Sequence, residues 1–166
     1  EFSGVFNPFY AESGYDAYAT YLMFDYLVER DFDAEPIPGA ADFEICDGGL
    51  KYIFTLKDGV KFWDGTPATA EDIEFAYYVD AYKNGDADKI EGIKVIDEKT
   101  IEITCEQPSA LAIWNLGIQL VPKKIYGEGF KKGDTSKVKA ITNNPMGTGQ
   151  YKFVQYKEGE SLALVA

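Results

Sequence analysis

Carboxylates are the most abundant side chains in this sequence that could do chemistry. The chain has 28 aspartate and glutamate residues but no histidine, so the commonest general base and member of catalytic triads is absent. Adjacent acids such as Glu71 and Asp72 stand at the expected start of a helix, where capping explains them. Gly147-Thr148-Gly149 is too short for a phosphate-binding loop and precedes an expected strand. We therefore expect no catalytic residue, no cofactor and no enzymatic activity.

Metal binding is not expected either. Asp31, Asp33 and Glu35 alternate as calcium ligands can, but the rest of a calcium loop is missing, and a solvated turn is the favoured interpretation. The two cysteines, Cys46 and Cys105, are far apart and lack Cys-x-x-Cys spacing, which argues against zinc. They could form a disulfide if neighbouring strands carry them, although buried free thiols are the favoured interpretation.

The overall charge argues against other classes of partner. The formal net charge is −12 and the sequence pI is about 4.4, whereas nucleic-acid binding needs clustered Lys and Arg. An acidic surface also disfavours adsorption to anionic lipid, and no apolar run approaches the roughly 20 residues of a membrane-spanning helix. With 166 residues, 46% of them hydrophobic, the sequence predicts one globular domain over residues 1–166.

A helix is predicted after the N-terminal loop. Residues 13–16, Ser-Gly-Tyr-Asp, form a capping box in which the hydroxyl and the carboxylate satisfy free amides at the helix start. The helix should continue to about Leu27. Apolar residues that include Tyr18 and Tyr21 give it a broad face, which we expect to be buried in the core.

A second main helix is predicted from Thr69, which begins another capping box, to about Lys83. Segments with alternating apolar and polar residues indicate hairpins. The expected strand pairs are residues 41–45 with 50–56, 93–96 with 101–105, and 150–156 with 161–165. The other segments are a loop or edge segment at 33–38, a short helix at 109–116 capped by Ser109, and a loop or short helix at 123–144. Hairpins separated by helices predict a mixed α/β fold of the α+β class.

One long segment points to a known family. Residues 51–75, with the sequence KYIFTLKDGVKFWDGTPATAEDIEF, closely resemble the signature of extracellular solute-binding proteins of family 5, the oligopeptide- and dipeptide-binding group. The resemblance continues in the same order along nearly the whole chain. The further matching segments are Phe6-Asn7-Pro8, residues 38–41, residues 97–103 with Gln107-Pro108, Val121-Pro122-Lys123, and residues 145–153.

The resemblance implies a fragment of a periplasmic-binding-protein-like type II lobe, with antiparallel hairpins and two main helices. Members of the family are several times longer and close two hinged lobes around a ligand. Residues 1–166 would be part of the first lobe, including its inserted subdomain, and the link at residues 84–91 would be shorter than in relatives. We expect a longer parent chain, because the sequence begins at Glu1 without methionine and ends in an apolar run.

The resemblance also implies a function in transport. In the family, the binding protein captures an extended oligopeptide and delivers it to the membrane permease subunits of an ABC importer. The implied location is extracellular or periplasmic, at the outer face of the cell membrane, with a lipid anchor in bacteria that have one membrane. A nickel complex, haem or an oligosaccharide is an alternative ligand, and a protein-interaction module is an alternative function. We expect a monomer that binds no nucleic acid.

Three candidate ligand contacts follow from the resemblance. Ala11, Glu12 and Ser13 stand where relatives pass close to the main chain of the ligand. Most of the ligand surface would lie on the second lobe, so residues 1–166 alone should bind peptide weakly or not at all. The signature residues have structural interpretations, as turn, cap and packing positions: Asp58-Gly59, Asp64-Gly65, Thr69 and Trp63.

Overall fold

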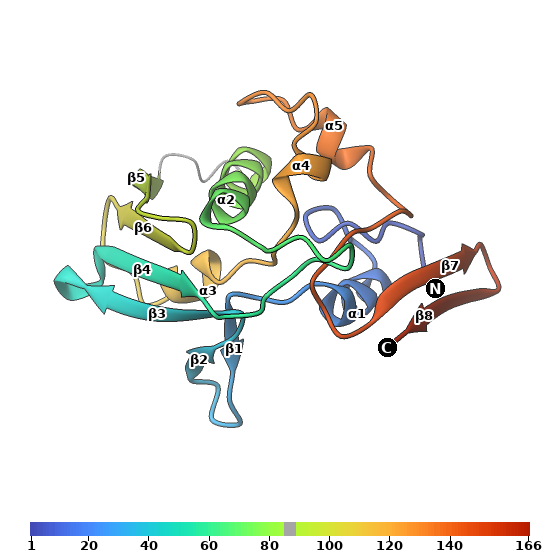
Figure 1. The fold of residues 1–166 in the computed structure, drawn as a ribbon, viewed down its shortest axis with the longest axis horizontal. Coiled ribbons are helices and arrows are strands. Elements are labelled where there is room, and N and C mark those ends of the chain that lie inside the picture. Colours follow the sequence, from blue (N-terminus) through green and yellow to red (C-terminus); the bar gives the residue numbers. More distant parts are fainter. Residues whose placement is uncertain (85–88) are drawn as a thin grey trace.

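The computed structural model describes residues 1–84 and 89–166. The helices in this part of the chain are α1 (Gly14–Met23), α2 (Ala70–Asn84), α3 (Ala112–Leu116), α4 (Lys123–Tyr126) and α5 (Ser136–Lys139). The strands are β1 (Val28–Arg30), β2 (Pro36–Pro38), β3 (Ala41–Cys46), β4 (Lys51–Leu56), β5 (Ile90–Val95), β6 (Thr100–Cys105), β7 (Lys152–Lys157) and β8 (Ser161–Val165). Figure 1 shows β3–β6 at one end of the molecule and the β7–β8 hairpin at the other, with α2 between them.

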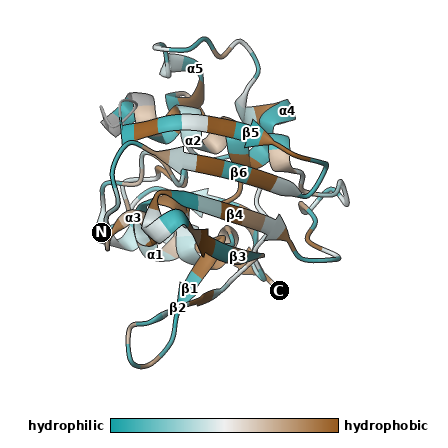
Figure 2. Ribbon diagram, turned by 90° about the vertical axis from the view of Figure 1, so that its left-hand side faces the viewer, coloured by the Kyte–Doolittle hydropathy of each residue, from teal (hydrophilic) through white to brown (hydrophobic). Residues whose placement is uncertain are grey.

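The largest sheet has the strand order β3-β4-β6-β5, and all its neighbouring strands are antiparallel. In its register, Phe54 of β4 faces Phe43 on one side and Ile101 on the other. Buried residues of β4 and β6 alternate with more exposed ones, and Figure 2 shows bands of hydrophobic and hydrophilic residues along these strands. The two predicted hairpins are therefore confirmed, although β5 begins at Ile90 rather than at residue 93.

α2 packs between two clusters of buried side chains. Ile73 and Tyr77 contact the cluster that covers one face of the large sheet, and the Tyr77 hydroxyl donates to the Leu116 carbonyl of α3 at 2.6 Å. Phe75 and Val79 belong to a second cluster, shared with α1, α4 and the β7–β8 hairpin. Because apolar side chains on both sides of α2 are buried, this helix positions the sheet relative to the N-terminal segments.

α1 ends at Met23, not near Leu27 as the apolar pattern predicts. Phe24 is extended (φ −131°, ψ 122°), and the Leu27 N–H donates to the Ile118 carbonyl at 3.0 Å. Tyr26 also forms an isolated antiparallel bridge with Gln119. Pairing with a distant segment therefore replaces the last expected turn of the helix.

The predicted burial of the α1 tyrosines is wrong. Tyr18 is 78% exposed and Tyr21 is 54% exposed, whereas the buried residues of α1 are Asp16, Ala19, Thr20 and Met23. The pattern could not indicate which face is buried, because apolar residues surround nearly the whole helix. Tyrosine tolerates exposure, since its hydroxyl remains hydrated. The structure thus has an exposed aromatic face on α1, formed by Tyr15, Tyr18 and Tyr21.

Residues 33–38, predicted as a loop or edge segment, include β2, which pairs with β1 in a short hairpin. Asp31 Oδ1 accepts hydrogen bonds from the main-chain N–H groups of Asp33 and Glu35 at 2.9 and 2.8 Å. This carboxylate therefore closes the hairpin turn, as the solvated-turn interpretation predicts.

Other predictions agree with the structure except at a few boundaries. α3 begins at Ala112, because Ser109 closes a preceding turn, in which its Oγ accepts from Leu111 N at 3.2 Å, and does not cap the helix. The segment at 123–144 contains α4 and α5, and the last predicted strand pair is β7–β8. Residues 85–88 of the predicted short link lie outside the described residues.

Both cysteines have free thiols. Cys46 is paired with Lys51 across β3 and β4, and Lys51 is paired with Thr104 across β4 and β6. Cys105 follows Thr104, so its side chain points to the opposite face of the sheet. The free-thiol interpretation is confirmed, although only Cys105 is buried and Cys46 is half-exposed.

Candidate functional site

The three predicted ligand contacts lie together where the N-terminal loop enters α1. The Ala11 N–H donates to the Asn7 carbonyl at 2.9 Å. Ser13 is the N-cap of α1, and its Oγ accepts from the Tyr15 N–H at 3.2 Å. Glu12 between them is exposed, whereas Ala11 and Ser13 are half-buried. We refer to these three residues as the 11–13 segment.

The main chain of the 11–13 segment is open to a partner. Within the described residues, the N–H groups of Glu12 and Ser13 and the carbonyl groups of Ala11 and Glu12 make no hydrogen bond. Ser13 has extended dihedral angles, φ −70° and ψ 136°. Free peptide groups in an extended segment can pair with the main chain of another extended molecule, as an added strand does.

Asn7 fixes the 11–13 segment to a distant part of the chain. Its fully buried side chain donates from Nδ2 to the carbonyls of Val138 and Ile141 at 2.8 and 2.9 Å. Its Oδ1 accepts from the Phe9 N–H at 3.0 Å. Sequence analysis missed this role. The available signal was Asn-Pro, a pair typical of turns, but nothing in the sequence indicates partners so far along the chain.

Asp16 anchors the other side of the 11–13 segment. Its buried carboxylate accepts from the main-chain N–H groups of Ser3 and Val5, each at 3.1 Å, and from the Ser3 hydroxyl. The predicted capping box is therefore confirmed for Ser13 but wrong for Asp16. This acid holds the N-terminal loop against α1 and is not bonded to the helix start.

Gly147-Thr148-Gly149 packs against the end of α1. The Thr148 Oγ1 accepts from the Asp25 N–H at 3.1 Å, and the Gly149 N–H donates to the Met23 carbonyl at 2.9 Å. A Cβ atom on Gly147 would lie 2.0 Å from the Met23 carbonyl oxygen, so the segment needs glycine for a close main-chain approach. This tripeptide has a structural role in the protein.

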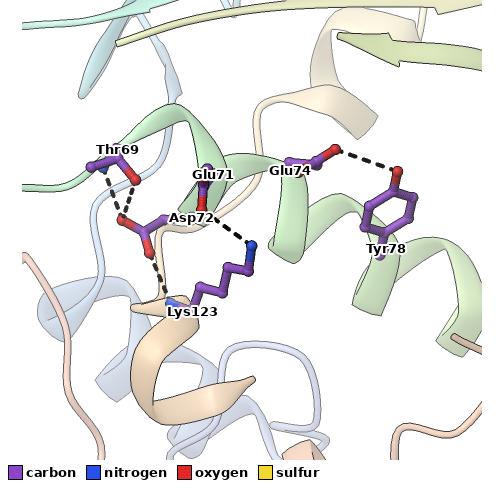
Figure 3. A network of polar contacts seen from close by, with 6 residues as sticks. All are labelled: Thr69, Glu71, Asp72, Glu74, Tyr78 and Lys123. Atoms are coloured by element: carbon purple, nitrogen blue, oxygen red, sulfur yellow. Dashed lines mark hydrogen bonds and ion pairs between the residues drawn. The ribbon is translucent and has the colours of Figure 1, made fainter. Parts of the chain in front are cut away.

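A buried carboxylate in the signature segment joins α2 to α4. Asp72 Oδ2 accepts from the N–H of Thr69 at 2.8 Å and from its hydroxyl at 3.2 Å, and Oδ1 accepts from the Lys123 N–H at 2.8 Å (Figure 3). Burial raises the pKa of Asp72, and these hydrogen bonds oppose the rise. The second predicted capping box is thus confirmed for the bond in which the Asp72 carboxylate accepts from the Thr69 N–H. Both oxygens of Asp72 are occupied, which makes it a structural group.

Two hollows lie outside the 11–13 segment. One has a volume of about 530 Å³ and lies among α2, the end of β6 and α3, where Tyr77, Cys105 and Leu116 line it. The other has a volume of about 520 Å³, and Glu29 and Lys57 are among its lining residues. Burial raises the pKa of Glu29, although the Tyr21 hydroxyl, which donates to it at 3.4 Å, acts in the opposite direction. Neither hollow includes the 11–13 segment.

Within residues 1–84 and 89–166, no group of three or more His, Cys, Asp or Glu side chains could hold a metal ion together. Among the described helices, none has the length and apolar character needed to cross a bilayer.

Comparison with known sequences identifies related proteins. A family model described as "Bacterial extracellular solute-binding proteins, family 5 Middle" matches residues 35–166. A Brucella ovis protein, provisionally named as an ABC transporter peptide-binding protein, is 31% identical over 176 residues. That alignment covers 99% of this chain but 32% of the Brucella protein, so the chain spans about a third of the length of this relative.

Comparison with solved structures identifies the same fold. The periplasmic binding protein DppA of Helicobacter pylori, in complex with the peptide STSA, is 25% identical with a TM-score of 0.78, covering 96% of this chain and 36% of that one. The oligopeptide-binding protein AppA of Bacillus subtilis, in complex with a nonapeptide, is 23% identical with a TM-score of 0.83, covering 98% of this chain and 34% of that one. The predicted lobe fragment of the type II periplasmic-binding-protein class is confirmed.

Proposed function

This chain belongs to the bacterial extracellular solute-binding proteins of family 5, and from this premise we propose that it forms part of the substrate-binding component of an ABC importer. The protein captures oligopeptides between two hinged lobes. Residues 1–166 supply one domain, which is part of the first lobe and includes its inserted subdomain, and the second lobe lies in the remainder of the parent polypeptide.

The open main chain of the 11–13 segment is the observation that carries the proposal. Within the described residues, the N–H groups of Glu12 and Ser13 and the carbonyls of Ala11 and Glu12 are unbonded, and Ser13 is extended. An extended peptide that pairs with these groups is held through its own main chain. Affinity then depends little on the side chains of the peptide, as a receptor for many sequences requires.

The exposed aromatic face of α1 supports the proposal that a second lobe covers this domain. Tyr15 and Tyr18 are 58% and 78% exposed, and they lie on α1, which directly follows the 11–13 segment. Large exposed aromatic side chains commonly mark surfaces that another protein unit covers. Closure of a second lobe over this face would remove water from a peptide bound at Glu12 and Ser13, which strengthens its hydrogen bonds.

The partners and the location follow from the same proposal. The closed receptor, a monomer, delivers peptide to the permease subunits of the importer at the outer face of the cell membrane, with a lipid anchor where the bacterium has a single membrane. The alternative ligands are a nickel complex, haem or an oligosaccharide. Peptide is preferred over these because unpaired main-chain groups match a peptide main chain.

The proposal is tested by removing one N–H group from the 11–13 segment. Ser13→Pro removes the free N–H of Ser13, and the observed φ of −70° suits proline. Ser13→Ala is the matched control, because both variants lose the side-chain cap but alanine keeps the N–H. In the two-lobed polypeptide, we expect Ser13→Pro to bind a pentapeptide roughly tenfold more weakly than Ser13→Ala. Equal affinities of the two variants by calorimetry would contradict the proposal.

The isolated chain provides a second test. Half of a two-sided site lacks the burial that lobe closure provides, so residues 1–166 should not bind a random tripeptide or pentapeptide library with micromolar affinity. Micromolar binding by this chain alone would show that no second lobe is needed.

A further inference from the structure

Two lysines flank the ring of Tyr10, the residue that directly precedes the 11–13 segment. Lys83 Nζ, on the last turn of α2, lies 5.2 Å from the ring centroid, and Lys139 Nζ, at the end of α5, lies 5.8 Å from it. Both lysines are exposed. Three segments that are distant in the sequence therefore bring two ammonium groups to one surface point, which we call the Tyr10 site.

The Tyr10 site is held in place by contacts within the protein. The Tyr10 hydroxyl donates to Thr135 Oγ1 at 2.5 Å. The buried Asn7 side chain donates to the carbonyl of Val138, the residue before Lys139. The rings of Phe75 on α2 and Phe130 pack edge to face at 5.2 Å, which fixes α2 against the loop before α5. The lysines are therefore positioned without a ligand.

In the part of the chain that the structure describes, the positive charge of the Tyr10 site has no acidic partner. Among the described residues, no acidic side chain lies within ion-pair distance of Lys83 or Lys139. By contrast, Lys99 pairs with Asp58 and Lys157 pairs with Glu160. The half-buried Tyr10 ring attracts each cation only modestly and does not neutralise it.

The surroundings strengthen this charge. Residues 123–139 contain six lysines and two acids, Glu128 and Asp134, in a chain whose net charge is −12. All six lysines are exposed, and Lys132 Nζ lies 4.1 Å from the Tyr78 ring centroid on the neighbouring α2. Lys123 is paired with Glu71, but lysines still outnumber acids along this stretch, and like charges that lie close together favour an anion between them.

We propose that the Tyr10 site is an anion subsite beside the 11–13 segment, and that it favours peptides with acidic side chains. The inference rests on the proposed function, because it assumes that a peptide pairs with Glu12 and Ser13. Tyr10 is adjacent to Ala11, so a carboxylate on the bound peptide can reach Lys83 or Lys139. Lysine contacts an anion as a point charge. The subsite therefore selects the negative charge of an acidic side chain.

The inference is tested by comparing triglutamate with trialanine in the two-lobed polypeptide. We expect triglutamate to bind about tenfold more tightly, with a preference that falls at high salt. The double variant Lys83→Gln/Lys139→Gln should lose the preference and keep its affinity for trialanine. The control Lys94→Gln/Lys152→Gln removes two exposed lysines elsewhere and should keep the preference. Equal binding of the two peptides by the unmodified protein would overturn the inference and leave the proposed function standing.

A second measurement does not depend on peptide capture. Glutarate, a dicarboxylate, is titrated into residues 1–166, and the lysine side-chain signals are followed by NMR. We expect the signals of Lys83 and Lys139 to shift and that of Lys94 to stay unchanged. Equal shifts of all three, or none, would overturn the anion subsite. Failure of both tripeptides to bind the two-lobed polypeptide, with the glutarate shifts present, would instead count against the proposed function.

Discussion

The indole Nε1 of Trp63 donates to the Gly149 carbonyl at 3.0 Å. This bond joins the signature segment to the Gly-Thr-Gly segment near the last strands, and the Trp63 N–H also donates to the Gly147 carbonyl at 3.1 Å. Both segments pack at the end of α1, since the Trp63 ring lies 6.3 Å from that of Phe24. Residues that identify the family by sequence are thus joined in one structural junction at the C-terminal end of α1.

Gly147→Ala should disrupt this junction. The new Cβ would lie 2.0 Å from the Met23 carbonyl oxygen, so the main chain would have to move. We expect a loss of about 1–3 kcal/mol in the free energy of unfolding, measured by urea denaturation. Gly14→Ala is the control, because nothing lies within 4 Å of its Cβ position. Similar stabilities of the two variants would argue against the close approach.

Asn7→Ala should destabilise the protein by roughly 2–4 kcal/mol, because it leaves the carbonyls of Val138 and Ile141 and the N–H of Phe9 without their partner. Hydrogen exchange at Tyr10 and Ala11 should also become faster. Asn144→Ala removes an exposed asparagine and should change stability by no more than about 0.5 kcal/mol. If Asn7→Ala proved as mild as Asn144→Ala, Asn7 would not be the anchor of the 11–13 segment.

Tyr18→Ala tests whether the exposed aromatic face of α1 contributes to peptide binding and not to the stability of the core. In residues 1–166 alone, we expect a stability change within about 0.5 kcal/mol, because the ring is 78% exposed. In the two-lobed polypeptide, the same change should weaken peptide binding by reducing lobe closure. Met23→Ala, at a fully buried position on the same helix, should cost about 2–5 kcal/mol. A large loss of stability for Tyr18→Ala in the isolated chain would contradict the observed exposure.

The loss of stability caused by Asp72→Asn should depend on pH, and it should be larger at acidic pH. Burial raises the folded-state pKa of Asp72 above its ordinary value of 3.8, so the folded protein binds this proton more tightly than the unfolded chain does. The contribution of Asp72 to stability therefore increases as pH falls through the folded pKa toward 3.8. Asparagine cannot titrate, and we expect a loss of about 1–3 kcal/mol at pH 7 and a larger loss at pH 4. A smaller loss at pH 4, by urea denaturation, would show that the hydrogen bonds outweigh burial.

The hairpins and the start of α2 could be predicted because their signals are local. Alternation in β4, with Tyr52 and Phe54 buried and Thr55 exposed, reflects one buried face of the sheet. Thr69 and Asp72 are three residues apart, and one helical turn suffices to bring them together. Predictions of this kind need no knowledge of the rest of the chain.

The sequence-based predictions are wrong where contacts between distant parts of the chain determine the local structure. Asp16 has the spacing of a capping residue, but the N–H groups of Ser3 and Val5 occupy its carboxylate. α1 ends early because Leu27 pairs with Ile118. The Tyr10 site depends on three segments, α2, α5 and the N-terminal loop, whose proximity no local pattern encodes. Such contacts become visible only in the structure.

The bond from Asn7 to Val138 has a consequence for the order of folding. Its two partners are 131 positions apart in the chain. This hydrogen bond can therefore form only after most of residues 1–166 has been synthesised. The hairpin of β3 and β4, whose partners are near neighbours, can form much earlier. Within residues 1–166, the 11–13 segment is thus synthesised before α5 but completes its anchoring only after α5 has emerged.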